Sequence, residues 1–204
     1  MTGTTLVTGT TVDQIEKRIR LALAARLSPA RILHSEGVAL LAGELCLRFC
    51  EPVASGRLAG LAHDLAREMS PAEIRSLATQ DGGPLGADEE EQPVLLHGRA
   101  GAVLLAAMGV DDPAVLQAVR DHVTGRPGME QLSSIVYVAD FLEPGRGFLP
   151  ETERLGSLRG SLAEMVSLVL RATVAYLSER GRPIAAVSRD LAGWLEQERG
   201  SNGS

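Results

Sequence analysis

Leucine, alanine and other apolar residues recur at intervals of three and four along most of the chain, between segments punctuated by proline and glycine. This spacing puts apolar side chains on one face of a helix, and no segment alternates convincingly in the manner of a strand. The pattern predicts an all-α protein that folds as a single-domain helical bundle. We expect helices near residues 12–27, 29–50, 53–69, 71–80, 94–108, 113–124, 130–143, 151–180 and 183–199.

Two helix starts carry a clear local signal. Ser28 and Ser70 each stand directly before a proline. A side-chain hydroxyl at the N-cap and a proline at the first helical position both favour the start of a helix. Glu73 follows Ser70 by three residues, so the second start also has the spacing of a capping box.

Some segments are predicted to lie outside the helical domain of residues 12–199. The ends, residues 1–11 and 200–204, are small and polar, and we expect them to be disordered. The run DGGPLGADEEEQ, which follows Gln80, is rich in glycine and acidic residues. That composition favours a solvated loop with no part in the chemistry.

The length and charge of the chain limit its functions. Its 204 residues, 45% of them hydrophobic, can bury one substantial core, and the formal net charge is −6. That charge disfavours broad attraction to nucleic acid or to an anionic membrane. A signal-peptide pattern is absent, and the most apolar segment is too short to span a bilayer. We therefore expect a cytoplasmic protein with a small-molecule partner, and a homodimer is left open.

The candidate chemistry begins with histidine. All four histidines fall on different predicted helices or at their ends: His34, His63, His97 and His122. Asp64 follows His63 directly, beside the apolar stripe of its predicted helix, so this pair can face a cleft between helices. Taken alone, any one of these histidines is more often an ordinary core or surface residue than a ligand.

Asp140 is a second anomaly, because it interrupts the apolar run IVYVADFL. A buried carboxylate without a partner is energetically costly. A bound cation removes that cost, and imidazole and carboxylate groups are good ligands for iron, manganese or zinc. A hydrogen bond to Asp140 would be an equally good explanation for this residue alone.

The order of these residues resembles that of the HD superfamily of metal-dependent phosphohydrolases. Three blocks, Leu96-His97-Gly98 with Gly101, His122 to Met129 and Ile135 to Arg146, resemble the YqeK-type symmetrical bis(5′-nucleosyl)-tetraphosphatases. The resemblance covers roughly residues 28–195. It implies an HD-type helical bundle that splits diadenosine tetraphosphate symmetrically into two ADP.

The resemblance also implies a ligand set for two metal ions. His34, His63, Asp64 and Asp140 would bind one ion, and Asp64, His97 and His122 the other. The family favours iron, with manganese, cobalt or zinc as alternatives, and a hydroxide bridging the ions would attack phosphorus. The expected catalytic residues are His63, Asp64, Arg67, His97 and His122. Family members often have lysine where this chain has Arg67, which keeps the positive charge but changes the phosphate geometry.

Several residues near the proposed ligands are candidates for binding a phosphate chain: Arg67, Thr124, Gly125, Arg126 and Arg146. Arg126 is the strongest candidate, because it follows a glycine-terminated helix in a tight loop. For Arg67 and Arg146, ion pairs with neighbours such as Glu68 or Glu143 are an equal alternative. Aromatic residues make up only 3% of the chain, and the sequence does not identify a base pocket.

Three other functions stay open at this point. A different HD-type nucleotide phosphohydrolase, acting on a monophosphate, a triphosphate or an alarmone, would use the same ligands. A regulatory module would bind a nucleotide without turning it over, and a broken ligand set would favour it. A purely structural bundle would make the six ligand candidates a coincidence. The sequence shows no nucleophile elbow, phosphate-binding loop or dinucleotide fingerprint, which favours metal-based chemistry.

Overall fold

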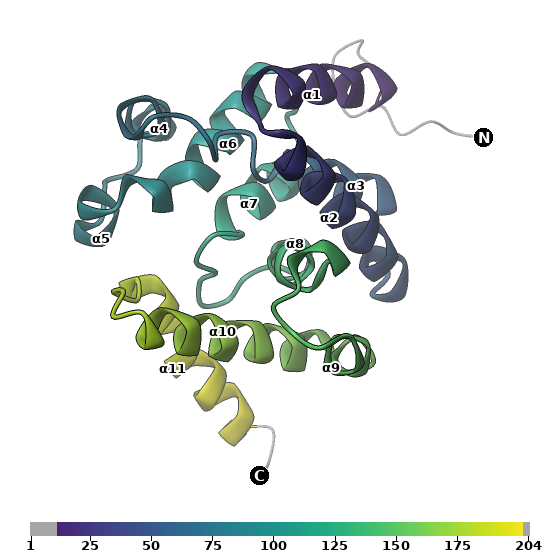
Figure 1. The fold of residues 1–204 in the computed structure, drawn as a ribbon, viewed down its shortest axis with the longest axis vertical. Coiled ribbons are helices and arrows are strands. Elements are labelled where there is room, and N and C mark those ends of the chain that lie inside the picture. The colour runs from purple at the N-terminus through teal and green to yellow at the C-terminus, as the bar shows by residue number, and fades with distance from the viewer. Residues whose placement is uncertain (1–11, 202–204) are drawn as a thin grey trace.

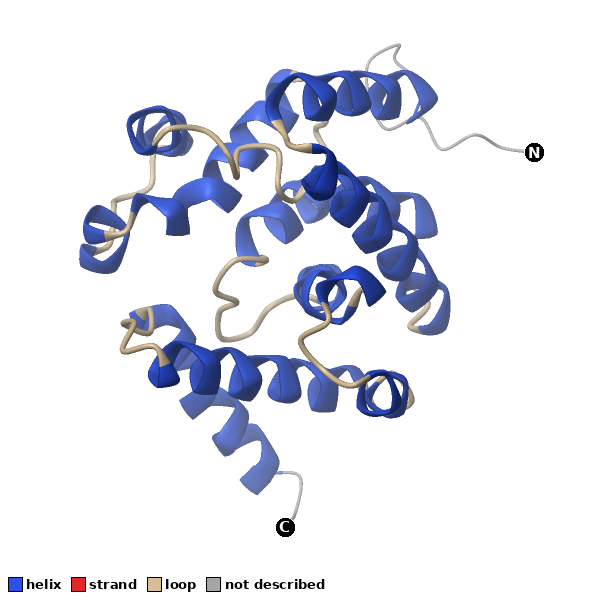
Figure 2. Cartoon of the chain, viewed as in Figure 1, coloured by secondary structure: helices blue, strands red, loops and turns tan. Residues whose placement is uncertain are grey.

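The computed structural model describes residues 12–201, and within that range it contains helices, loops and turns but no strand (Figures 1 and 2). The predicted all-α class is confirmed. The α-helices, in chain order, are α1 (Val12–Arg26), α2 (Pro29–Arg48), α3 (Val53–Ala62), α4 (Pro71–Ala78), α5 (Ala87–Glu91), α6 (His97–Ala107), α7 (Pro113–Asp121), α8 (Gln131–Leu142), α9 (Glu151–Ser157), α10 (Leu162–Glu179) and α11 (Ala186–Ser201). Three 3₁₀ helices accompany them: η1 (Thr79–Asp81), η2 (Pro93–Leu96) and η3 (Pro144–Arg146).

The predicted disordered ends fall mostly outside this range. Residues 1–11 and 202–204 are not among the described residues. Gly200 and Ser201, which were grouped with the C-terminal tail, are the last residues of α11.

The helices form a central group with a second layer beneath it. Helix α2 packs against α3 and α8, and α7 packs against α6, α3 and α8. In Figure 1, α4 and α5 lie beyond α6 at one side, while α10 runs across the face of α8 and α11 lies against α10. The C-terminal helices thus cover the central group from one side.

One continuous hydrophobic cluster joins most of these helices. Side chains such as Ile15, Leu61, Ile135 and Leu191 are at most 1% exposed, and each stabilises the fold by about 1.5–3 kcal/mol through burial. A smaller cluster lies under α4, around Ile74. No helix among the described residues is long and apolar enough to cross a membrane.

The two predicted helix starts are correct, but they are built differently. The Ser70 side chain accepts a hydrogen bond from Glu73 N, and the Glu73 carboxylate accepts one from Ser70 N, so the predicted capping box is confirmed. Ser28 makes no such cap. Its hydroxyl and its backbone N–H donate to the carboxylate of Glu68, at 2.9 and 2.6 Å, which ties the start of α2 to the segment after α3.

Three predicted segments were wrong. The helix predicted over residues 53–69 ends at Ala62, so the His63–Asp64 pair lies in the turns that follow α3 and not within a helix. The helix predicted over 151–180 is two helices, because Ser161 and Glu164 form a capping box that restarts the chain at α10. The acidic run expected to be a solvated loop contains α5, and its Asp81 side chain is only 2% exposed.

Candidate metal centre

The ring nitrogens of the four histidines converge at the centre of the molecule with two carboxylates. On one side, His34 Nε2 lies 3.2 Å from His63 Nε2 and 2.9 Å from Asp140 Oδ1. On the other, His97 Nε2 lies 3.0 Å from His122 Nε2. The structure brings all six predicted ligands together, and three overlapping triplets have ligand atoms within 4.8 Å of one another: His34, His63 and Asp64; His63, His122 and Asp140; Asp64, His97 and His122.

Asp64 joins the two sides of this cluster. Its Oδ2 lies 3.4 Å from His63 Nε2, and its Oδ1 lies 3.3 Å from His97 Nε2 and 3.8 Å from His122 Nε2. The Asp64 side chain is 2% exposed. A single carboxylate is therefore positioned to contact ions on both sides.

Three of the histidine rings are held by the same kind of hydrogen bond to the backbone. The Nδ1 of His63, His97 and His122 each lies within hydrogen-bond distance of the backbone carbonyl three residues earlier, at 2.7, 2.5 and 2.8 Å. Each of these histidines stands where a helix begins or ends, so that carbonyl is available to the ring. Because a carbonyl can only accept, Nδ1 of each ring carries a proton, and Nε2 is the nitrogen that faces the cluster.

His34 is held differently, from the middle of α2. Its Nδ1 lies 2.8 Å from Glu143 Oε1, and the Glu143 residue is only 4% exposed. A carboxylate behind a ligating histidine fixes the ring orientation and raises its basicity. Glu143 was predicted only as an ion-pair neighbour of the arginines, and sequence reasoning missed this role.

Two glycines let the backbones that carry the ligands approach closely. A Cβ on Gly60, one turn before His63, would lie 2.9 Å from Ala39 Cα of α2. A Cβ on Gly98, next to His97, would lie 2.7 and 2.8 Å from the carbonyl oxygens of α7 at positions 120 and 119. The spacing of the ligands therefore depends on the absence of a side chain at Gly60 and Gly98.

The chemistry and the spacing of the cluster suit divalent metal binding. Metal–nitrogen bonds of about 2.1 Å in tetrahedral or octahedral geometry place neighbouring ligand atoms about 3.0–3.4 Å apart. Five of the close ligand pairs described above lie between 2.9 and 3.4 Å. The Nε2 atoms of His97 and His122 lie 3.0 Å apart, which is the spacing of two ligands of one ion.

The ionisation of the cluster supports the same conclusion. Burial opposes a charge on His63, but the carboxylates of Asp64 and Asp140 outweigh it and raise the pKa of His63 to about 10. Burial lowers the pKa of His122 to about 4, which keeps that imidazole neutral. Burial opposes ionisation of Asp64 and Asp140 as well, yet the adjacent histidines hold both pKa values well below the usual range. Both carboxylates thus remain charged in the cluster, which suits them as metal ligands.

A cavity of about 240 Å³ opens onto this cluster and is lined with cationic groups. Arg67 and Arg146 line it, and Arg146 donates to the Asp140 carboxylate and, at 3.0 Å, to its backbone carbonyl. Burial lowers the pKa of Arg67 despite the nearby carboxylates. Neither arginine pairs with Glu68 or Glu143, so the ion pairs considered from the sequence do not form.

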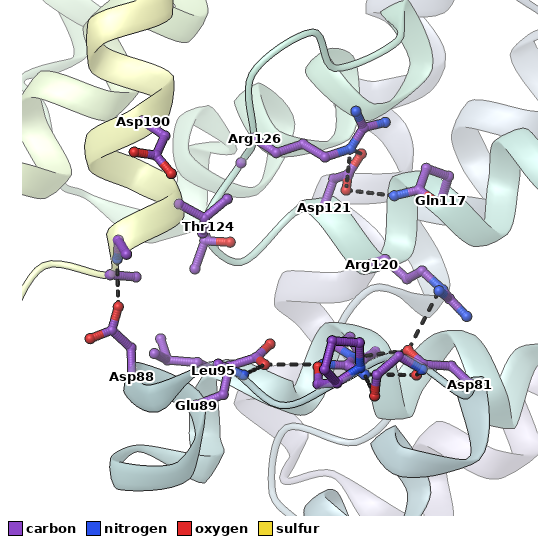
Figure 3. Close-up of a pocket in the computed structure, with 18 residues that line it drawn as sticks. Asp81, Asp88, Glu89, Leu95, Gln117, Arg120, Asp121, Thr124, Arg126 and Asp190 are labelled. Carbon is purple, nitrogen blue, oxygen red and sulfur yellow. Dashed lines mark hydrogen bonds and ion pairs between the residues drawn. The ribbon is translucent and has the colours of Figure 1, made fainter.

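Arg126, the strongest phosphate candidate from the sequence, lies elsewhere. It lines a neighbouring cavity of about 520 Å³ together with Gly125, and its Nε donates to both carboxylate oxygens of Asp121 at 3.1 Å (Figure 3). Thr124 lines both cavities. Of the predicted substrate-binding residues, Arg67, Thr124 and Arg146 therefore line the metal-side cavity, whereas Gly125 and Arg126 do not.

Two further cationic residues near the centre were not predicted. Arg31 Nη1 donates to Asp64 Oδ2 at 2.7 Å, and its position one turn before His34 on α2 is a signal that could have been used. Arg182 lines the metal-side cavity from the loop between α10 and α11. Only the packing of the C-terminal helices brings Arg182 there, so no local sequence pattern indicates it.

Comparisons with known proteins agree with this geometry. The family model described as HD domain matches residues 31–145, a range that contains all six proposed ligands. A Bacillus subtilis (strain 168) protein named symmetrical bis(5′-nucleosyl)-tetraphosphatase is 30% identical over 171 residues, covering 83% of this chain and 91% of that protein. A Halalkalibacterium halodurans protein of the same name is 32% identical over 164 residues, covering 78% of this chain and 84% of that protein.

A solved structure shares most of this architecture. The crystal structure of a predicted HD superfamily hydrolase involved in NAD metabolism from Clostridium acetobutylicum matches with a TM-score of 0.85 and 31% sequence identity. The match covers 90% of this chain and 97% of that one. The likeness therefore extends beyond the range of the family model to the C-terminal helices.

Proposed function

Because the chain belongs to the HD domain family, we propose that it is a metal-dependent hydrolase that cleaves diadenosine tetraphosphate between its two central phosphates and releases two ADP. The observation that carries the proposal is the convergence of four histidines and two aspartates in a chain that aligns with 91% of the Bacillus subtilis tetraphosphatase. A regulatory module without turnover would not need the complete ligand set.

We infer two divalent ions, with iron first and manganese, cobalt or zinc as alternatives. His34, His63, Asp64 and Asp140 would hold one ion, and Asp64, His97 and His122 the other. When bound, such a pair supplies an activated water and neutralises charge on the phosphoryl oxygens. The buried histidines and Asp64 exclude bulk water from one side of the centre.

The arginines of the metal-side cavity would bind the phosphate chain. Arg67 and Arg146 lie on the side of Asp64 and Asp140, and Arg182 approaches from the C-terminal loop. Guanidinium groups bind phosphate oxygens through paired N–H donors, and partial burial strengthens that interaction. Arg31 is already paired with Asp64, so its proposed role is to fix the orientation of that carboxylate.

The proposal is tested by separating the products that metal-loaded protein forms from diadenosine tetraphosphate. ADP should be the only nucleotide product, and Asp64→Ala should abolish its formation because Asp64 touches both ligand groups. A mixture of ATP and AMP would refute symmetrical cleavage while keeping a hydrolase. Tight nucleotide binding without turnover would favour the regulatory module instead.

A further inference from the structure

Three of the few aromatic side chains gather beside the metal-side cavity. The sequence has three phenylalanines, two tyrosines and one tryptophan. The ring of Phe148, in the loop between η3 and α9, lies 5.0 Å from that of Phe141 on α8 and 6.2 Å from that of Tyr176 on α10, measured between ring centroids. Half of the aromatic residues thus meet at one place, where α10 runs across α8 (Figure 1).

Two of these rings are open to solvent. Phe141 is partly buried against the main hydrophobic cluster, whereas Phe148 is 48% exposed and Tyr176 is 43% exposed. A single exposed apolar residue is ordinary on a protein surface, but two adjacent exposed rings offer π-faces to a third flat ring. Phe148 and Tyr176 therefore form a surface on which a ligand ring can stack, and we call this pair the aromatic platform.

Arg146 connects the aromatic platform with the proposed metal centre. Its guanidinium donates to the Asp140 carboxylate, and its Cζ lies 5.4 Å from the centroid of the Phe148 ring. Arg146 also lines the metal-side cavity, as does Leu177, the residue after Tyr176 on α10. One guanidinium group therefore separates the platform from a proposed metal ligand.

Cationic groups accompany both rings of the aromatic platform. The Cζ of Arg180 lies 3.9 Å from the centroid of the Tyr176 ring, as Arg146 lies over Phe148. Arg182, two residues after Arg180, lines the metal-side cavity. A guanidinium group beside an aromatic ring can bind a phosphate or stack on a base. A ligand that combines a flat ring with phosphate groups suits this arrangement, whereas a purely apolar ligand would not use the cations.

We propose that the aromatic platform stacks the base at one end of the substrate, the end whose phosphates leave the metal centre past Arg146. This inference rests on the proposed function. Diadenosine tetraphosphate carries a nucleoside at each end and would place its central bond at the metals, so its two bases must lie in different places. Neither Arg146 nor a platform residue lines the neighbouring cavity of about 520 Å³, so a base on the platform lies outside that cavity. Stacking uses the face of a base and not its hydrogen-bonding edge, so this end of the site accepts any purine.

The test uses two ligands that differ by one nucleoside. The first is an analogue of diadenosine tetraphosphate in which a methylene group replaces the central bridging oxygen, so that it is not cleaved there. The second is adenosine 5′-tetraphosphate with the same replacement. Calorimetry on manganese-loaded protein should give tighter binding of the first ligand, although the second carries the greater negative charge. Phe148→Leu should lower the affinity for the first ligand by about 5- to 10-fold and remove most of its advantage over the second, because leucine is apolar but has no π-face.

Phe49→Leu is the matched control. Phe49 also has a guanidinium over its ring, with Arg48 Cζ 4.8 Å from the centroid, but it lies at the end of α2 and lines neither cavity. This control should keep both affinities. Tyr176→Leu is a second variant of the platform and should repeat the effect of Phe148→Leu. All proteins are compared at equal manganese content, measured by elemental analysis.

The comparison of the two ligands separates base stacking from a structural role of the ring. Equal weakening of both ligands by Phe148→Leu would mean that the ring only supports Arg146 against the phosphates, and it would overturn the inference. Equal affinity of the unmodified protein for the two ligands, or unchanged affinities in both platform variants, would overturn it as well. If Phe148→Leu removes the advantage of the first ligand but the protein does not hydrolyse diadenosine tetraphosphate, the proposed function is refuted and the stacking site is not.

Discussion

Gly98→Ala tests whether the approach of α6 to α7 sets the spacing of the metal ligands. The new Cβ would lie 2.7 Å from Arg120 O and 2.8 Å from Val119 O. Ordinary contact begins at 3.4 Å, so one helix must move by about 0.7 Å. Both obstacles are backbone atoms, and no flexible side chain can relieve the contact by rotating.

The displacement acts directly on two of the histidines. Val119 O accepts the hydrogen bond from His122 Nδ1 at 2.8 Å, and His97 is the residue before Gly98. Separation of the helices would widen the 3.0 Å distance between the two Nε2 atoms. Outer-shell changes of this kind lower metal affinity by about 10- to 100-fold. Overpacking costs about 1–3 kcal/mol, and the helix propensity of alanine returns up to about 1 kcal/mol.

Metal affinity is measured by chelator competition and stability by denaturant unfolding of the metal-free protein. Gly101→Ala is the control on the same helix, because its Cβ would lie 3.4 Å from Val119 Cγ1 and 3.5 Å from His63 O, which is ordinary contact. The control should keep its metal affinity, and its stability should stay the same or rise by up to about 1 kcal/mol, because alanine favours the helix there too. If Gly98→Ala matches the control in both measurements, the argument that bare backbone sets the ligand spacing is wrong.

Further predictions concern the ligands themselves. Asp64→Ala should remove bound metal from both sides, measured by elemental analysis, and full occupancy would contradict a shared carboxylate. Glu143→Gln should still bind metal, but its metal affinity in chelator competition should fall by about 10- to 100-fold, because the amide holds the His34 imidazole less strongly. Unchanged affinity would exclude an orienting role for Glu143. Since the metal-free protein keeps His63 protonated up to pH about 10, an ion must displace that proton. Metal affinity should therefore rise with pH between about 6 and 9, with about one proton released, and a flat profile would refute this.

The sequence predicts the helical class from local patterns and the ligand candidates from a resemblance to a known family. Helical periodicity and the capping box at Ser70 are visible over a few residues. The carboxylate within an apolar run at Asp140 indicates a partner, but the resemblance to the HD superfamily is what selected the six ligands. Their convergence, by contrast, depends on the packing of five helices and is observed only in the structure.

The errors come from side-chain contacts that helical periodicity does not show. Helix periodicity continues through His63 and Asp64, but the His63 ring binds a carbonyl at the end of α3 and the chain turns there. Arg126 stands beside Thr124 in the sequence, yet Asp121 directs its guanidinium into the neighbouring cavity. The acidic run around Asp81 looks solvated until Arg99, 18 residues later, neutralises it.

The way in which the histidine rings are held has a consequence for how the centre can change during evolution. Three of the four rings bind backbone carbonyls, which every amino acid supplies, so point mutations of other side chains cannot remove those bonds directly. Only His34 depends on a second side chain, that of Glu143. Substitution of Glu143 is therefore the one direct way to change the orientation of a histidine ring in this cluster, and it acts on the side that contains Asp140. Relatives that differ in how they bind metal should therefore differ first at Glu143 and His34. The side formed by His97 and His122 should stay constant.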